Sequence, residues 1–169
     1  MAVERIQFEQ WIAVPLDKVF LFFANPQNLP RIMPPSTGTR LTKLTLKPPP
    51  LNATVSDTSA LAGVGSEIDT SFRLLPFLPI RAGWTALITE FEWNHHFADI
   101  QKRGPFRSFH HRHEFVVEER SQMGTLIRDI IDFEVGYGIL GSIAQEVFVR
   151  RELERTFAYR QNALSRVSF

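Results

Sequence analysis

Hydrophobic and polar positions alternate with a period of two between Phe106 and Val135. A polar stretch at Glu118 to Gly124 divides this segment, so we predict a β-hairpin. With the turn near Ser121, His113 falls opposite Asp129. One face of the first strand then carries Phe109, His111, His113, Phe115 and Val117, and the matching face of the second carries Ile127, Asp129, Ile131, Phe133 and Val135. Two imidazoles and a carboxylate thus interrupt an otherwise apolar surface.

The remaining chain predicts more strands and three helices. The other alternating segments are Val3–Val14, Arg40–Lys47, Gly65–Leu75, Arg81–Trp93 and Phe97–Lys102. Two short apolar helices are expected after the first strand, at Leu16–Phe23 and directly after Asn25-Pro26. From Leu140 to about Leu164 the period becomes helical, and no proline interrupts it. The polar, proline-rich stretch from Pro48 to Gly63 predicts a long loop that could act as a gate.

This order of elements predicts an α+β fold in one domain, residues 1–169. We expect a curved antiparallel sheet of about six to seven strands, two short helices after the first strand, and one long C-terminal helix packed over the sheet. A space between such a sheet and helix is a common place for a ligand.

Composition narrows the function classes. The formal net charge of +1 gives no argument for nucleic-acid binding. The absence of cysteine excludes disulfides and thiolate chemistry, and the 15 phenylalanines indicate a wide apolar interior. No run of about 18 apolar residues occurs, so we expect a cytoplasmic protein without stable membrane insertion.

Several motifs together resemble the START-like superfamily (SRPBCC, or helix-grip fold), and above all its bacterial members of unassigned activity and its polyketide cyclase/dehydrase-like proteins. The segments that carry the resemblance are Val14–Pro34, Phe97–Gln101, Gly104–Phe106, Phe109–Phe115, Gly124-Thr125 with Asp129, Leu140-Gly141 and Phe157–Arg160. The resemblance covers nearly the whole chain. It implies a cavity for a hydrophobic ligand between the concave face of the sheet and the long helix.

Three roles are open to His111 and His113, which leave their strand on the same face. Each ring could hydrogen-bond to a buried carboxylate or to the backbone. The pair could instead act as general acid and base or orient a ligand, with Asp129 holding His113. A metal site of His-His-carboxylate type is the least favoured, because the usual helical spacing is absent. We therefore predict no metal and no cofactor.

The remaining polar residues are expected mainly at the surface of the protein. Asp99 and Gln101 share a face of their strand, and they extend the polar cluster if that face is the inner one. His95-His96 should lie in an exposed turn, and His110 should point outward. The basic series Arg150, Arg151, Arg155, Arg160 and Arg166 is typical of a solvated helix face.

We expect the ligand-binding residues to be Trp84, Asp99, Gln101, Phe109, His111, His113, Phe115, Asp129, Ile131, Phe133 and Phe148. The leading hypothesis is a monomer or homodimer that binds a lipid, quinone or polyketide-like molecule. The alternative is a cyclase/dehydrase-like enzyme with His113 and Asp129 as acid and base. A third hypothesis is an interaction protein whose basic C-terminal helix meets a membrane surface or an acidic partner.

Overall fold

A computed structural model describes residues 3–73, 80–136 and 142–169, with the side chains of the last helix described from residue 147. Within these ranges the elements are β1 (Glu4–Ile12), α1 (Leu16–Ala24), the 3-10 helices η1 (Pro26–Ile32) and η2 (Pro35–Thr37), β2 (Arg40–Thr45), β3 (Glu67–Arg73), β4 (Arg81–Glu92), β5 (His96–Arg103), β6 (Phe106–Glu119), β7 (Met123–Val135) and α2 (Ser142–Leu164). The predicted strand end at Leu75 and the predicted helix start at Leu140 lie outside the described residues.

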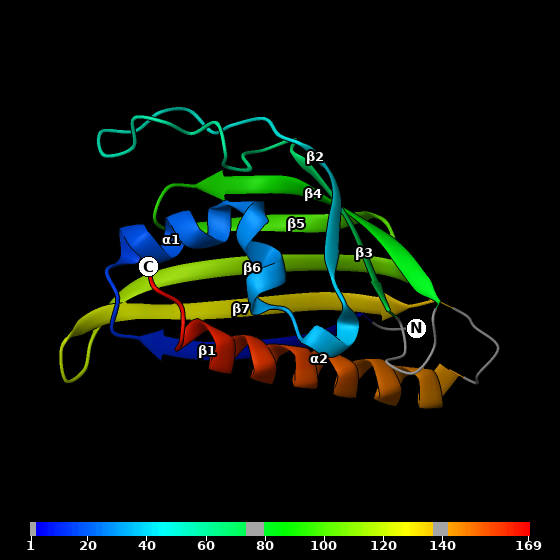
Figure 1. Ribbon diagram of the computed structural model, residues 1–169. Helices are drawn as coiled ribbons and strands as arrows, with labels where there is room; N and C mark the ends of the chain where they lie inside the picture. The colour runs from blue at the N-terminus through cyan, green and yellow to red at the C-terminus, as the bar shows by residue number, and fades with distance from the viewer. Residues whose placement is uncertain (1–2, 74–79, 137–141) are drawn as a thin grey trace.

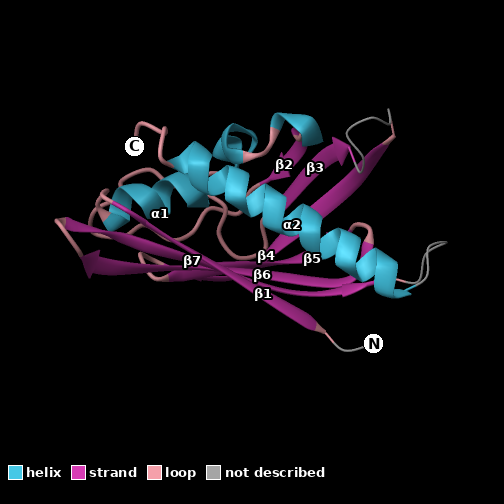
Figure 2. Cartoon of the chain, turned by 90° about the horizontal axis from the view of Figure 1, so that it is seen from below, coloured by secondary structure: helices cyan, strands magenta, loops and turns pink. Residues whose placement is uncertain are grey.

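The strands form one antiparallel sheet whose order is β1-β7-β6-β5-β4-β3-β2. Its seven strands and the long C-terminal helix confirm the predicted α+β architecture. Helix α2 runs along the sheet near β1, α1 covers the same side of the sheet, and η1 lies between α1 and α2 and contacts both (Figure 1, Figure 2). The helices therefore cover one face, which we call the inner face.

The β6–β7 hairpin has the register expected from the sequence. Glu119 pairs with Met123, which leaves Ser121 at the centre of the turn, and His113 pairs with Asp129. Strand β1 approaches the hairpin closely at Gly124, where a Cβ atom would lie 2.5 Å from the carbonyl oxygen of Ile12. A side chain at this position would push β1 away from the hairpin.

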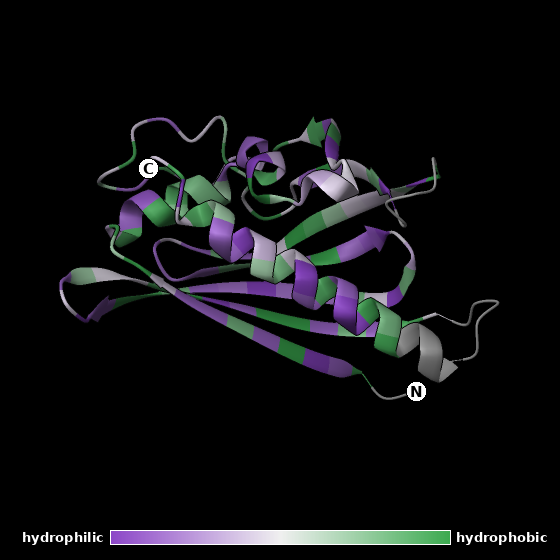
Figure 3. Ribbon diagram, turned by 60° about the horizontal axis from the view of Figure 1, so that its bottom comes forward, coloured by the Kyte–Doolittle hydropathy of each residue, from purple (hydrophilic) through white to green (hydrophobic). Residues whose placement is uncertain are grey.

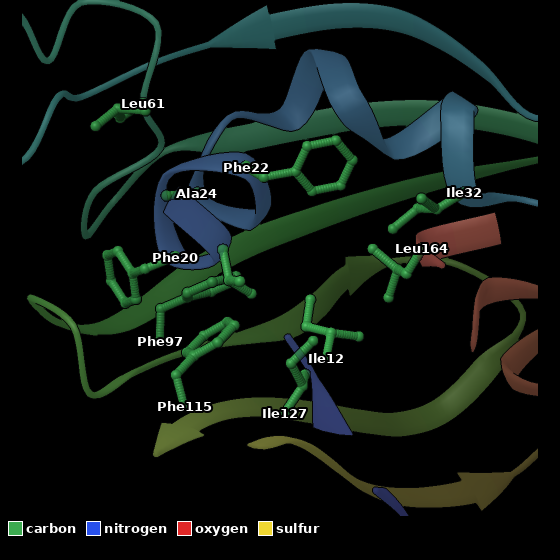
Figure 4. Packing of buried hydrophobic residues seen from close by; sticks show 11 residues of the cluster. Ile12, Phe20, Phe22, Ala24, Ile32, Leu61, Phe97, Phe115, Ile127 and Leu164 are labelled. Atoms are coloured by element: carbon green, nitrogen blue, oxygen red, sulfur yellow. The ribbon is translucent and has the colours of Figure 1, made fainter. Parts of the chain in front are cut away.

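One core cluster fills the space between α1, η1 and the strands β1, β5, β6 and β7. Phe20 of α1 is fully buried and makes edge-to-face contacts with Phe115 and Phe97, whose ring centroids lie 5.3 and 6.1 Å away. Figure 4 shows Leu164 at the end of α2 beside Ile32, so both ends of the chain contribute to this cluster. Burial of aromatic rings on this scale is the main source of the fold's stability.

Polar and apolar residues are interleaved along α2 (Figure 3). The residues that pack against the sheet are Val149, Leu153, Phe157 and Leu164. Phe148 was expected inside, but 44% of it is exposed. That expectation is wrong because the stripe facing the sheet passes through Val149, and the next residue back lies about 100° round the helix.

The opposite, outer face carries a ladder of ion pairs. Arg128 bridges Glu9 and Glu114, with N–O distances of 2.6 and 3.2 Å. His110 also lies on this face, 3.9 Å from Asp132, which confirms its outward orientation. Inward and outward residues therefore alternate along β6 and β7, and each inward polar residue has an outward counterpart for comparison.

Candidate functional site

A compact polar cluster lies on the inner face at the centre of the sheet. It consists of Asp99 from β5, His111 and His113 from β6, and Asp129 from β7. The register places Asp99 beside His111 and His113 beside Asp129. His111, His113 and Asp129 are all buried. The alternation of each strand thus brings the predicted candidates together among apolar neighbours.

Both imidazoles approach the same carboxylate oxygen. His111 Nε2 lies 2.9 Å from Asp129 Oδ1, and His113 Nδ1 lies 2.7 Å from the same atom. The first contact has hydrogen-bond geometry; the second is a close contact that is not aligned for a hydrogen bond. The ring centroids of the two histidines are 3.9 Å apart. Asp99 Oδ2 stands 4.0 Å from His111 Nδ1 on the other side. Asp99, His111, Asp129 and His113 therefore form a continuous row.

Arg160 of α2 completes this cluster. It was interpreted from the sequence as part of a solvated helix face, but only 7% of it is exposed. Its guanidinium group lies over the rings of Phe157 and Phe23, 4.7 and 5.9 Å from their centroids. The signal was present in the helical period, because Arg160 follows Phe157 by three residues and precedes Leu164 by four. In the sequence alone the charge of Arg160 masks this signal, because charged side chains are usually exposed.

Burial and charge set the protonation of the cluster. Burial alone would raise the pKa of Asp129, but the positive charge of Arg160 and the contacts of both imidazoles outweigh it and hold that pKa well below its ordinary value. Burial, reinforced by the neighbouring His113, lowers the pKa of His111 to about 4. Burial also lowers the pKa of His113. At neutral pH both imidazoles are therefore neutral and Asp129 is ionised.

Asp99 behaves in the opposite way. Its burial raises its pKa, although the charges of His111, His110 and Arg160 oppose the rise. The two carboxyl groups of the row, which flank His111, thus differ in acidity, with Asp129 as the stronger acid. Such a separation is a common preparation for acid–base chemistry and for binding a polar ligand group.

Half-buried aromatic rings continue the inner face beyond the polar cluster. Trp84 of β4 contacts Phe109 edge-to-face at 4.8 Å and Phe106 at 5.8 Å. Phe109 in turn lies 6.3 Å from His111. This aromatic group, Trp84, Phe106 and Phe109, leads directly to the polar cluster.

The other predicted ligand-binding residues occupy different places. Phe115, Ile131 and Phe133 lie on the inner face but are almost completely covered by their neighbours in the core. Gln101 does not join the polar cluster, because its side-chain amide donates to the carbonyl oxygen of Phe106 and accepts from the N–H of the same residue. It closes the β5–β6 turn. Phe148 lies outside, as described above.

The arginines of α2 are also partly neutralised. Arg150 pairs with Glu4 at 3.1 Å, and Arg155 pairs with Glu152 at 2.6 Å. With Arg160 buried, the helix offers less free positive charge than its sequence suggested. This weakens the hypothesis of an anionic membrane surface or acidic partner.

Ligand atoms of Asp99, His111 and His113 lie within 4.8 Å of one another, as a metal site would require. However, the buried charge of Arg160 opposes a second cation nearby, and His111 already contacts Asp129. These features make the cluster a poor site for a metal ion.

Among the described helices, none has the length and hydrophobicity that crossing a membrane would need.

Neither family models nor curated proteins match this sequence. Solved structures do match its fold. An aromatase/cyclase, Zhui, from a Streptomyces species gives a TM-score of 0.70 at 14% identity, over 97% of this chain and 92% of that one. The major latex-like protein 151 of Panax ginseng gives 0.60 at 11% identity, over 96% and 95%. A START superfamily protein from Mycobacterium smegmatis gives 0.56 at 11% identity, over 95% and 94%.

Proposed function

Because the chain has the helix-grip fold of the START-like superfamily, we propose that it binds an apolar small molecule between the inner face of the sheet and α2. The aromatic group of Trp84, Phe106 and Phe109 would contact the apolar body of this molecule. The cluster of Asp99, His111, His113, Asp129 and Arg160 would contact its polar end. Apolar burial would supply most of the affinity, at about 25 cal/mol per Å² before the cost of ordering.

One observation carries this proposal: the buried Nε atom of Arg160 has no hydrogen-bond partner among the described residues. Leaving a buried donor unpaired costs about 1 to 3 kcal/mol, and more when the group is charged. A ligand oxygen that accepts a hydrogen bond from Arg160 would remove this cost.

The charges of the cluster favour a particular polar group. The positive charge of Arg160 is matched by ionised Asp129, and Asp99 is the group with the raised pKa. A ligand carboxylate would upset this balance, whereas a carbonyl or hydroxyl oxygen would not. We therefore propose a largely apolar ligand with a neutral oxygen at one end, such as a quinone, a sterol or a polyketide-like ketone.

Native mass spectrometry of the purified protein tests the proposal. The expected result is a co-purified molecule of this kind, or 1:1 binding from a panel of quinones, sterols and aromatic ketones. An empty protein that binds nothing in the panel contradicts it. In a positive case, Trp84→Ala and His113→Gln should weaken binding, and His110→Gln is the matched control because His110 lies on the outer face of the same strand.

A second candidate function is a cyclase-like reaction on a polyketide-like ketone. It is favoured by the 2.7 Å contact between His113 Nδ1 and Asp129, because a carboxylate at one ring nitrogen can hold the other ready to take a proton. The lowered pKa of His113 keeps that nitrogen unprotonated at neutral pH. The likeness to an aromatase/cyclase agrees with this chemistry at the level of fold.

Measurements of turnover and of ligand binding distinguish the enzyme from the binding protein. If the protein is an enzyme, His113→Gln should abolish conversion of a poly-β-ketone while substrate binding is largely kept. If it is a binding protein, the wild type should bind such a compound and release it unchanged.

A further inference from the structure

We propose that the β4–β5 turn binds a single zinc ion through Glu92, His95 and His96. These residues lie on the outer face and its edge, away from the buried cluster. His95 and Glu92 side chains are each 62% exposed, whereas the His96 side chain is 13% exposed. The proposal is independent of the function proposed above.

The distances between the three ligand atoms fit tetrahedral coordination. His95 Nδ1 and His96 Nδ1 are 2.9 Å apart, and each lies 3.4 Å from Glu92 Oε2. Zinc binds nitrogen and carboxylate oxygen at about 2.0 to 2.2 Å, which separates two tetrahedral ligand atoms by about 3.3 to 3.6 Å. Only the two nitrogens would need to move apart, by a few tenths of an ångström on this estimate.

A fourth side chain, that of Glu90, lies on the side of His96 that faces away from the proposed ion. Glu90 Oε2 lies 3.3 Å from His96 Nε2, the ring nitrogen that faces away from the proposed ion. A carboxylate on the far nitrogen of a metal-binding histidine fixes the ring and increases its basicity. Arg112 holds Glu90 in place by an ion pair.

The backbone of the turn keeps the ligands in position. Asn94 has a left-handed conformation with φ of 57°, and the N–H of His95 donates to the carbonyl oxygen of Glu92. The carbonyl oxygen of His95 accepts a hydrogen bond of 2.8 Å from the N–H of Phe115 in β6. The turn is therefore tied to the sheet, so little order has to be gained on binding. The exposure of His95 and Glu92 leaves room for a water molecule as fourth ligand.

An ion here would stiffen the turn that carries Trp93. The indole N–H of Trp93 donates to the carbonyl oxygen of Pro50, and its ring packs on Phe91 and Phe20. The turn thus links the core to the loop from Pro48 to Gly63. Zinc bound by the folded state should raise the midpoint of thermal unfolding as its concentration increases.

Isothermal titration calorimetry of the full, untagged chain with Zn²⁺ tests the site, and Co²⁺ absorption reports its geometry. We expect one ion per chain, a tetrahedral Co²⁺ spectrum and a higher unfolding midpoint. His95→Ala and His96→Ala should each remove all three signals, and Glu90→Gln should weaken binding about tenfold. His110→Ala is the control: His110 is a partly exposed histidine near the same Glu90, and its loss should change nothing.

Two results overturn the proposal. One is the absence of stoichiometric Zn²⁺ binding. The other is binding that survives His95→Ala and His96→Ala but disappears in His113→Gln, which assigns the ion to Asp99, His111 and His113 instead. Circular dichroism of each variant confirms that the turn substitutions leave the fold intact.

Discussion

His113 Nδ1 lies 2.7 Å from Asp129 Oδ1, and the two residues are direct cross-strand partners in the β6–β7 hairpin. The same oxygen contacts His111 at 2.9 Å, so one carboxylate holds both imidazoles. Replacing it affects the whole cluster, and the first prediction concerns this residue.

We expect Asp129→Asn to destabilise the protein by about 1 to 3 kcal/mol, because it removes the buried carboxylate that contacts both imidazoles and whose charge is stabilised by Arg160. Urea unfolding followed by circular dichroism measures this loss. Asp132→Asn is the matched control, since Asp132 lies on the outer face of the same strand and pairs with the exposed Arg5. Equal losses in both variants would contradict the role given to Asp129.

The second prediction concerns pH. The pKa of His111 falls from its ordinary 6.5 to about 4 on folding, so between these values the unfolded chain binds a proton that the folded chain does not. Stability should therefore fall as pH decreases through this window, by on the order of 3 kcal/mol for this group. His113 acts in the same direction, and Asp99, whose pKa is raised, acts against it.

Urea unfolding at pH 7 and pH 5 tests this slope. In His111→Asn the difference between the two pH values should be smaller than in the wild type, whatever the absolute stability of the variant. His110→Asn should keep the wild-type difference. A His111 variant with an unchanged slope would show that this imidazole titrates normally.

The third prediction concerns Arg160. We expect Arg160→Leu to destabilise the protein by about 1 to 3 kcal/mol, because it removes the buried positive charge that favours the ionised form of Asp129. Arg155→Leu should have little effect, since 75% of the Arg155 side chain is exposed. The double variant Asp129→Asn/Arg160→Leu should lose less than the sum of the single losses, because the two charges are coupled. Strictly additive losses would argue against this coupling.

The fourth prediction compares two phenylalanines of α2. Phe157 stacks on Phe8 at 4.5 Å and touches His111 edge-to-face, so Phe157→Ala should cost about 3 to 5 kcal/mol through the cavity it leaves. Phe148→Ala should cost less than about 1 kcal/mol, because Phe148 is 44% exposed. Thermal and urea unfolding of both variants check this, and a large loss at Phe148 would reverse the assigned helix face.

The hairpin was the part of the fold most accessible from sequence. Its two strands alternate over many residues, and a slip of one residue would turn His113 and Asp129 outward, so burial fixes the register. That is why the pairing of His113 with Asp129 was predicted and is confirmed.

The buried face of α2 was harder to predict from the sequence. The hydrophobic positions drift round this long helix, so the pattern is compatible with more than one buried face. Whether Phe148 or Val149 packs on the sheet depends on where α2 meets β1 and β7, and the local sequence does not contain that information. Arg160 was misjudged for a related reason: a charge is usually exposed, and only the packing of Phe157 and Leu164 on the sheet draws it inside.

Gln101 illustrates a third limit. Its inward-facing strand position fitted the polar cluster, but its amide satisfies both backbone groups of Phe106. Whether the Gln101 side chain faces a ligand or bonds to the local turn depends on its side-chain conformation. The alternation of residues along a strand does not predict that conformation.

Strands β1 and β7 are neighbours in the sheet although they lie far apart in the sequence, and this affects how the chain folds. Glu4 pairs with Phe133 and Ile12 with Thr125, so the first strand acquires its partner only after most of the polypeptide has left the ribosome. Contacts of such long sequence separation slow folding. Until then the apolar side of β1, with Ile6 and Ile12, stays uncovered, and a nascent chain stalled before β7 should be a good substrate for chaperones and proteases.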